Sequence, residues 1–378
     1  MTIARLIACL FLPLILLFGG CGSSFPHDTT RVRWSDPQGL APRDTLTLVT
    51  GPTPASVTSE TLGSSLGCRE LILSWNADVP RGCGMRVEAR VRSDQDAQWS
   101  PWLLMGDSGD VTTDAPLTSS GTAKVDVDLL ESTSWFKQSQ VRITVVAGVD
   151  AKPGAIVIVH RLDITRTLAG GRVMKGLRRE LTGPPPDWHA LGLPATIDLD
   201  APFLTQKTPR PELSGRLCSP ASVAMALHWA GRADATVEAV ANAAHDPRHD
   251  LYGNWPRNVQ AAWSFGVPGK VARMGSLADA WRTLASGVVI VASIRADKGQ
   301  LREAPYGDTQ GHLILIRGYD AEGNLLVNDP ACSTPEAGRR VYSRRDMVQV
   351  WLLNKSGTCY LFAKPSEAGR LDAEGVAP

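Results

Sequence analysis

Three residues that could work together as nucleophile, base and orienting acid are spread over the second half of the chain. The first, Cys218, is followed by Ser219 and Pro220. Serine caps the free N–H groups of a helix and proline fits its first turn, so we expect a helix to begin here. The positive end of a helix stabilises a thiolate, which predicts that the pKa of the Cys218 thiol falls towards neutrality. Without partners, the same residue would be an ordinary buried helical cysteine.

Suitable partners lie further along the chain. His312 opens an apolar run typical of a strand, and Asp329 closes the next such run after a short turn. A hairpin of this kind brings both side chains to the same end of a sheet. This predicts a Cys-His-Asp triad in which His312 takes the proton of Cys218 and Asp329 orients the imidazole. Asn328 is a weaker candidate for the third role, because neighbouring strand residues point to opposite faces.

The N-terminal end carries the pattern of a secretory signal. Residues 6–18 are almost wholly apolar and are followed by Gly19, Gly20 and Cys21. This apolar run is too short for a bilayer, which needs about 20 helical residues, but it suits a signal peptide. The junction resembles the lipobox of bacterial lipoproteins, which implies a signal peptide over residues 1–20 and lipidation of Cys21. A plain signal peptide with a chance cysteine is the alternative.

Lipidation would place the protein in the cell envelope, anchored to a membrane and facing outside the cytoplasm, because several acyl chains together hold firmly. Such a compartment is oxidising, which makes the cysteine count informative. Five cysteines remain once Cys9 and Cys21 are set aside: Cys68, Cys83, Cys218, Cys332 and Cys359. Local pairing would form disulfides between Cys68 and Cys83 and between Cys332 and Cys359, although the sequence alone does not determine connectivity. Cys218 would then be the free thiol.

Composition and periodicity divide the chain into two folded parts. Residues 21–43 are rich in serine, threonine, proline and aspartate and predict a tether. From 44 to 165 apolar and polar residues alternate, which predicts an antiparallel β-sandwich. Residues 166–195 contain a basic run and three consecutive prolines, and they predict a linker.

The period changes from residue 196 onwards, where helical patterns come first and strand-length apolar runs follow. We expect helices at 220–230, 237–244, 259–265 and 277–284, and strands at 288–294, 312–319, 325–328 and 360–363. This order predicts an α+β domain over residues 196–365, with residues 366–378 as a tail.

Charge and aromatic content bear on the partners. The chain has 39 lysine and arginine residues against 38 aspartate and glutamate residues, so no global positive field attracts nucleic acid, and no nucleic-acid partner is expected. Four tryptophans of the first part could form a face that binds a glycan ligand: Trp75, Trp99, Trp102 and Trp135. Packing in the core or at its edge is the more ordinary fate of such side chains.

Four motifs follow one another in the second part. They are Pro202-Phe-Leu-Thr-Gln206, Cys218-Ser-Pro-Ala-Ser-Val-Ala-Met225, Gly311-His-Leu-Ile-Leu-Ile-Arg-Gly-Tyr-Asp320 and Val327-Asn-Asp-Pro330. Together they resemble the peptidase C39-like family of papain-fold cysteine peptidases over about residues 196–365. The resemblance implies a papain-like fold, no cofactor, and an oxyanion hole formed by the Gln206 amide and the Cys218 backbone N–H. Ser219 departs from the glycine that the family usually has after the nucleophile.

A histidine-containing loop precedes one of the expected helices. Residues 245–250 hold two histidines four positions apart and could bind a metal if they were helical, but Pro247 argues against a helix. We therefore expect a solvated loop and no metal site. Tyr252 and Trp255 follow it and could line a substrate cleft, although core packing of Trp255 is an equal alternative.

Taken together, the sequence predicts an envelope-anchored thiol hydrolase, a cysteine peptidase that cleaves a peptide or protein substrate through a Cys218 thioester. Two alternatives stay open. An acyltransferase would use the same fold and triad, with an amine replacing water at the thioester. A non-catalytic lipoprotein would bind peptides or glycans without reacting with them.

Overall fold

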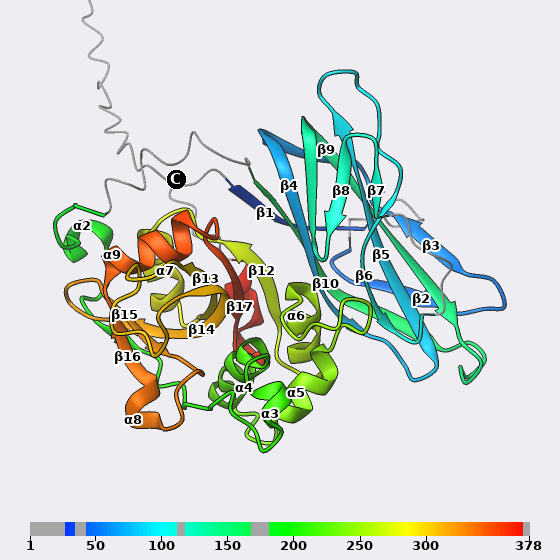
Figure 1. Cartoon of the computed structure of the whole chain (residues 1–378). Helices are drawn as coiled ribbons and strands as arrows, with labels where there is room; N and C mark the ends of the chain where they lie inside the picture. The colour runs from blue at the N-terminus through cyan, green and yellow to red at the C-terminus, as the bar shows by residue number, and fades with distance from the viewer. Residues whose placement is uncertain (1–26, 35–42, 112–117, 168–180, 373–378) are drawn as a thin grey trace, which may run out of the picture.

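The computed structural model describes residues 27–34, 43–111, 118–167 and 181–372. Two antiparallel sheets form its framework, one from the N-terminal part and one from the C-terminal part. Among the described residues, the helices lie in the C-terminal part, around the second sheet (Figure 1). The chain is therefore α+β, with a β-rich N-terminal domain ahead of a mixed C-terminal domain.

Ten strands of the described N-terminal residues are hydrogen bonded into one sheet. They are β1 (His27–Arg31), β2 (Leu46–Val49), β3 (Ala55–Thr58), β4 (Leu62–Asp78), β5 (Cys83–Ser93), β6 (Leu103–Gly109), β7 (Ser119–Ser120), β8 (Ala123–Asp126), β9 (Leu129–Ala147) and β10 (Ile156–Thr167). The main order is β1-β10-β4-β9-β5-β6; in addition, β2 pairs with β10, β3 and β8 pair with β9, and β7 pairs with β8.

The N-terminal sheet curls over a single core. In a flat sheet, β4 and β6 would lie about 14 Å apart, since two other strands separate them. Yet the indole N–H of Trp75 on β4 donates to Ser108 Oγ on β6 at 3.0 Å. The same ring lies so close to Gly106 that a Cβ there would stand 2.7 Å from it. The two halves of the sheet therefore face each other, and their apolar side chains pack in one cluster.

Two features of this domain differ from the expectations. Residues 27–31, within the predicted tether, form β1, because their backbone pairs with β10 and Asp28 binds the buried Arg166 guanidinium at 2.7 Å. The alternation of apolar and polar residues continues without a break through 123–129, as in a single strand, but the chain turns at Val127, whose φ is +59°. The turn separates β8 from β9, and the backbone N–H of Asp128 closes it by donating to the Asp126 carbonyl at 2.7 Å.

The described C-terminal residues form a seven-stranded sheet and several helices. The strands are β11 (Ile197–Asp198), β12 (Gly269–Arg273), β13 (Val289–Ala296), β14 (Thr309–Tyr319), β15 (Leu325–Asn328), β16 (Arg339–Tyr342) and β17 (Thr358–Phe362). The helices are α2 (Trp188–Leu191), α3 (Pro211–Ser214), α4 (Cys218–Trp229), α5 (Val237–Ala244), α6 (Trp255–Ser264), α7 (Leu277–Ala285), α8 (Pro335–Gly338) and α9 (Arg344–Met347), with a π-helical turn η1 (Val348–Leu353) and a 3₁₀ helix η2 (Pro365–Leu371).

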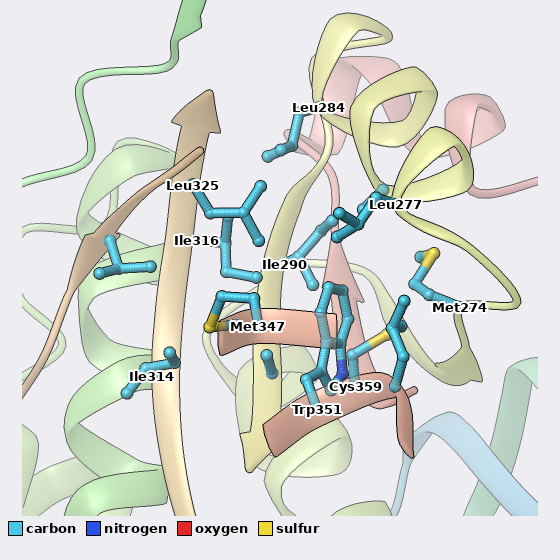
Figure 2. Packing of buried hydrophobic residues seen from close by; sticks show 14 of the residues in the cluster. Met274, Leu277, Leu284, Ile290, Ile314, Ile316, Leu325, Met347, Trp351 and Cys359 are labelled. Atoms are coloured by element: carbon cyan, nitrogen blue, oxygen red, sulfur yellow. The ribbon is translucent and has the colours of Figure 1, made fainter. Parts of the chain in front are cut away.

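The C-terminal sheet is covered on both faces, so its central strands are apolar on both sides. On one face, α4 packs on the strands through a core that includes Val223, Leu227, Val291, Leu313 and Leu315. On the other face, α7, α9 and η1 close a second core, shown in Figure 2, that includes Leu277, Ile290, Ile314, Met347 and Trp351. Alternate residues of β13 and β14 thus serve opposite cores and hold α4 in a fixed place on the sheet.

The two domains are joined at β12, an edge strand of the second sheet that lies beside β10 and β4 (Figure 1). Asn76 of β4 both donates to the Gly269 carbonyl at 3.1 Å and accepts from its N–H at 3.2 Å. Ser74 and Thr165 bind the N–H and the carbonyl of Val271 at 2.9 and 3.0 Å. Side chains of one domain therefore satisfy the edge of the other, which would otherwise be free to pair with another chain.

Some predictions concern residues outside the described ranges. The signal peptide at 1–20, Cys21, residues 168–180 of the linker and the last residues of the tail belong to this group. The first part of the predicted tail at 366–378 belongs to η2, and Leu371 in it is buried against the domain. None of the described helices combines the length and the apolar character needed to cross a membrane.

Candidate active site

Cys218 is the first residue of α4, and its side chain is only partly buried. The expected cap is wrong: Leu217 precedes the helix without a side-chain cap, and the Ser219 hydroxyl binds the Tyr360 hydroxyl of β17 at 2.9 Å instead. Ser222, one turn later, donates to the Leu313 carbonyl at 3.0 Å. Both serines thus fasten the first turns of α4 to the sheet, and this contact gives a physical reason for a serine after Cys218.

The hairpin of β14 and β15 places His312 beside Asp329. Asn328 pairs with Leu315, so the same register puts Asp329 opposite Ile314, two residues from His312 and on the same face. His312 Nε2 and Asp329 Oδ1 are 2.8 Å apart. Both side chains are buried, with the Asp329 side chain fully enclosed. The structure therefore forms the contact that the two strand ends predicted.

The pKa values of Cys218 and His312 are shifted by each other's presence, which links Cys218 to the His312–Asp329 pair in one relay. Burial raises the pKa of the Cys218 thiol, but the interaction with His312 and its positive charge lower this pKa by a larger amount. The pKa of Cys218 is therefore below its usual value. Burial lowers the pKa of His312, yet its bonds to Asp329 and Cys218 raise it to about 10. These opposite shifts favour a thiolate paired with an imidazolium across neutral pH.

Asp329 is held by four donors. Its Oδ1 accepts from His312 and, at 3.0 Å, from the backbone N–H of Ala331. Its Oδ2 accepts from the hydroxyls of Tyr306 at 3.0 Å and Tyr342 at 2.7 Å. Burial raises the pKa of this carboxyl, but the bonds and charge of His312 and the Tyr342 hydroxyl lower it below its ordinary value. Asp329 is therefore a stable carboxylate despite its burial.

The two tyrosines were missed from the sequence. Tyr306 lies in the segment between β13 and β14, and Tyr342 ends β16. No fixed spacing links either of them to Asp329, since they reach it from separate elements. Asn328, by contrast, points away from the relay as expected, and its amide donates to the carbonyls of Ala201 and Pro202 at 2.9 and 3.1 Å.

Gln206 is hydrogen bonded both to the segment that follows Asp329 and to the segment that precedes Cys218. Its backbone N–H donates to the Pro330 carbonyl at 2.9 Å, next to Asp329. Its side-chain Nε2 donates to the carbonyl of Ser214, four residues before Cys218, also at 2.9 Å. The described bond uses one of two amide hydrogens, while Oε1 is buried with no protein partner. A donating amide is thus held next to the turn that leads into Cys218.

The two predicted substrate-binding aromatics have different surroundings. Tyr252 packs beside the segment that precedes Cys218, with the Arg216 guanidinium 5.1 Å from its ring centre and Leu217 in the same cluster. Trp255 begins α6 at the domain boundary, where its backbone N–H donates to Asp128 Oδ2 at 2.6 Å. Its side chain joins the core between α4 and the sheet. The described contacts therefore bring Tyr252, and not Trp255, close to the residues that lead into Cys218.

The loop at 245–250 is held by hydrogen bonds between its own side chains. His245 binds Asp250 at 3.1 Å and His249 binds Asp246 at 2.9 Å. Among the described residues, no group of three histidine, cysteine or acidic side chains is arranged to hold a metal ion. The loop is not helical, as the proline in it indicated.

The predicted disulfides are not formed. Cys68 lies opposite Phe136 and Cys83 opposite Ala147, at widely separated points along β9, roughly 36 Å apart for an extended strand. A disulfide needs Cα atoms within about 7 Å. Proximity in sequence misled here, because β4 and β5 are long strands that carry the two cysteines away from each other.

The second predicted bridge fails for a similar reason. Cys359 is buried in β17, and two other strands separate β17 from β15, after which Cys332 follows. Figure 2 places Cys359 inside the core beside Trp351, well within the sheet. Burial raises the pKa of the Cys359 thiol, which makes it unreactive as well as inaccessible.

The tryptophans of the N-terminal domain are engaged by protein groups. Trp75 is fully buried in the core. Arg90 lies over the rings of both Trp99 and Trp102, with its guanidinium carbon 4.7 and 4.6 Å from their centres, and Arg142 also lies 4.6 Å from that of Trp102. The remaining tryptophan, at position 135, is covered by an arginine in the same way. These contacts use aromatic faces that a sugar ring would need for stacking.

Comparisons with known families match both parts of the chain. The Peptidase_C39 like family matches residues 198–359, and the Peptidase C39 N-terminal domain matches residues 27–161. The resemblance indicated by the four motifs is thereby confirmed. No curated protein matches the chain.

Likeness to solved structures is weak. The structure of the Gt strain of infectious bursal disease virus is 12% identical with a TM-score of 0.25, and the match covers 44% of this chain and 37% of that one. The crystal structure of the VP2 subviral particle of the same virus is 11% identical with a TM-score of 0.25, covering 44% of this chain and 39% of that one. The chain therefore spans less than half the length of these viral chains, and such scores carry no argument about fold.

Proposed function

Since this chain belongs to the peptidase C39-like family, we propose that it is a cysteine peptidase with Cys218 as nucleophile, His312 as general base and acid, and Asp329 as the group that orients His312. The relay that runs from the partly exposed thiol through a buried imidazole to a buried carboxylate is the observation that carries the proposal. The lowered pKa of Cys218 and the raised pKa of His312 support a preformed ion pair.

The proposed reaction has two stages. The Cys218 thiolate attacks the carbonyl of the scissile peptide bond, and the imidazolium of His312 gives its proton to the leaving amine, which leaves a thioester on the enzyme. Water, deprotonated by His312, then attacks the thioester, releases the acid and restores the thiol. The backbone N–H of Cys218 and the Nε2 amide of Gln206 would stabilise the oxyanion in both stages.

The wider arrangement is also part of the proposal. The helix that carries Cys218, packed against a sheet that carries His312 and Asp329, supports a papain-like arrangement of the C-terminal domain. The curled sheet around one core supports a β-sandwich as the N-terminal domain. The apolar run at 6–18 and the lipobox-like junction at Cys21 support a lipid anchor in the cell envelope.

Product analysis tests the proposal. Residues 22–378 would be incubated with a peptide library in ¹⁸O-labelled water, and the products identified by mass spectrometry. Peptidase activity predicts new C-termini that carry ¹⁸O, and their loss in the Cys218→Ala variant. Cys83→Ala is the matched control, since it removes a buried thiol of the other domain and should retain activity. Absence of cleavage by the wild type, together with no acyl mass on the Cys218 peptide after acid quenching, would overturn the proposal.

A further inference from the structure

We propose that Tyr306 and Tyr342 are positioning residues of this site, which keep Asp329 ionised and hold His312 in line with Cys218 through two hydroxyl bonds to Asp329 Oδ2. The inference rests on the proposed function of the relay. It concerns residues that act through Asp329 rather than on the substrate.

The side chain of Asp329 is fully buried. A fully enclosed carboxylate is unstable unless its oxygens find donors, because the charge is removed from water. One imidazolium does not satisfy both oxygens, since His312 approaches Oδ1 and leaves Oδ2 without a donor of its own. The hydroxyls of Tyr306 and Tyr342 fill that position at 3.0 and 2.7 Å. They are therefore the groups that allow Asp329 to remain charged with its other oxygen directed at His312.

Both phenols remain donors at any pH used for an assay. Burial, followed by the charge of Asp329, raises the pKa of Tyr306 and of Tyr342 well above the ordinary value. Both hydroxyls therefore keep their protons and continue to donate hydrogen bonds to Asp329 Oδ2. The two tyrosines together thus hold the Asp329 carboxylate in one orientation.

Tyr306 has a second contact that Tyr342 lacks. Its ring meets the imidazole of His312 edge to face, with ring centres 5.0 Å apart and an angle of 73° between the planes. The same side chain thus touches both members of the pair that it aligns. A rotation of His312 away from Cys218 would have to break this packing as well as the bond to Asp329.

Tyr342 supplies rigidity from another direction. It ends β16, is fully buried in the core around α7 and η1, and lies in register with Leu325 of β15. Its hydroxyl bond to Asp329 is the shorter of the two. Because β16 is the neighbour of β15 in the sheet, this contact fixes the strand end from which Asp329 projects.

The test measures ionisation of Cys218 in variants that remove only a hydroxyl. Alkylation of Cys218 by iodoacetamide would be followed against pH in the wild type, Tyr306→Phe and Tyr342→Phe, by mass spectrometry of the peptide that contains Cys218. Loss of one bond to a charged group should raise the midpoint of the thiolate titration by up to about one pH unit. The double variant should raise it further than either single change.

Tyr319→Phe is the matched control. Tyr319 is a fully buried tyrosine of β14, the strand that carries His312, but its hydroxyl donates to the Pro194 carbonyl at 3.0 Å and not to Asp329. This variant should lose some thermal stability without moving the Cys218 midpoint. A purely structural role for Tyr306 and Tyr342 predicts the same behaviour for all three variants.

The outcomes separate the two proposals. A wild-type thiol that titrates like a free cysteine would overturn the proposed function itself. An activated wild-type thiol whose midpoint stays unchanged in both Tyr306→Phe and Tyr342→Phe would overturn only the positioning role, as would an equal shift in Tyr319→Phe. If Tyr342→Phe does not fold, Tyr306→Phe decides alone, because Tyr306 lies outside the strands and is only partly buried.

Discussion

Asp128 is a buried carboxylate whose ionisation should work against folding. It lies at the domain boundary with its side chain almost inaccessible to solvent, and its Oδ2 accepts the backbone N–H of Trp255 at 2.6 Å. Burial raises the pKa of Asp128 from 3.8 to about 7, with Asp246 and Asp126 adding to the rise and the Trp255 bond opposing it. The negative charge of Asp128 also acts to raise the pKa of Lys355 and of Tyr360 in the C-terminal domain.

The sign of the effect follows from the direction of this shift. A carboxyl whose pKa is higher in the folded state contributes stability that is present below about pH 4 and is lost as the pH rises to about 7. At 1.36 kcal/mol per pKa unit, ionisation of the folded protein costs up to about 4 kcal/mol above pH 7. Asp128→Asn keeps an oxygen that can accept from Trp255 and removes the charge. The variant should therefore match the wild type near pH 4 and exceed its stability increasingly up to pH 8.

Urea unfolding followed by tryptophan fluorescence, at intervals from pH 4 to pH 8, measures the difference between the two proteins. Asp126→Asn is the control, since Asp126 belongs to the same turn but is exposed, and it should change stability by less than about 0.5 kcal/mol at every pH. A difference between Asp128→Asn and the wild type that does not vary with pH would refute the reasoning. So would a variant that is less stable than the wild type at pH 8.

Three further changes test other parts of the account. Asp329→Asn should leave His312 without its carboxylate, lowering kcat by about 10²–10⁴-fold in a peptide-cleavage assay and raising the pH midpoint of Cys218 alkylation; an unchanged midpoint would contradict the relay. Gln206→Ala should lower kcat by about 10²–10³-fold while Cys218 alkylation keeps its pH profile, and a change confined to KM would remove Gln206 from the oxyanion hole. Asn76→Ala should lower the free energy of unfolding by about 2–4 kcal/mol, because the N–H and carbonyl of Gly269 lose their partner; urea unfolding that matches the wild type would show that the domain contact is unimportant.

The parts of the structure that the sequence predicts well are those with strong local signals. Helix α5 and strand β15 have the predicted bounds, because capping residues and turn residues mark their ends. The approach of His312 to Asp329 was predictable for the same reason, since a hairpin of known register leaves little freedom for two strand ends. The start of a helix at Cys218 was predictable as well, because Pro220 suits a first helical turn.

Other features depend on contacts between distant segments, which no local pattern encodes. Serine is a residue type that often caps helices, but the Ser219 hydroxyl forms its hydrogen bond with the Tyr360 hydroxyl on β17 instead. Cys68 and Cys83 are close in sequence and lie far apart, because long strands carry them in different directions. Strand β12 was not predicted at all: the polar groups that stabilise its edge come from Asn76, Ser74 and Thr165 of the other domain.

The central claim is that Cys218 is an activated nucleophile in an ion pair with His312. The most direct test is the rate of Cys218 alkylation by iodoacetamide against pH, compared between the wild type and His312→Ala. In the wild type, we expect Cys218 to reach its full alkylation rate at a pH well below 8. In His312→Ala, the midpoint should rise above the ordinary cysteine value of about 8.5, because His312 no longer offsets the rise in the Cys218 pKa that burial causes. A wild-type midpoint near 8.5 that does not move in His312→Ala would contradict the central claim.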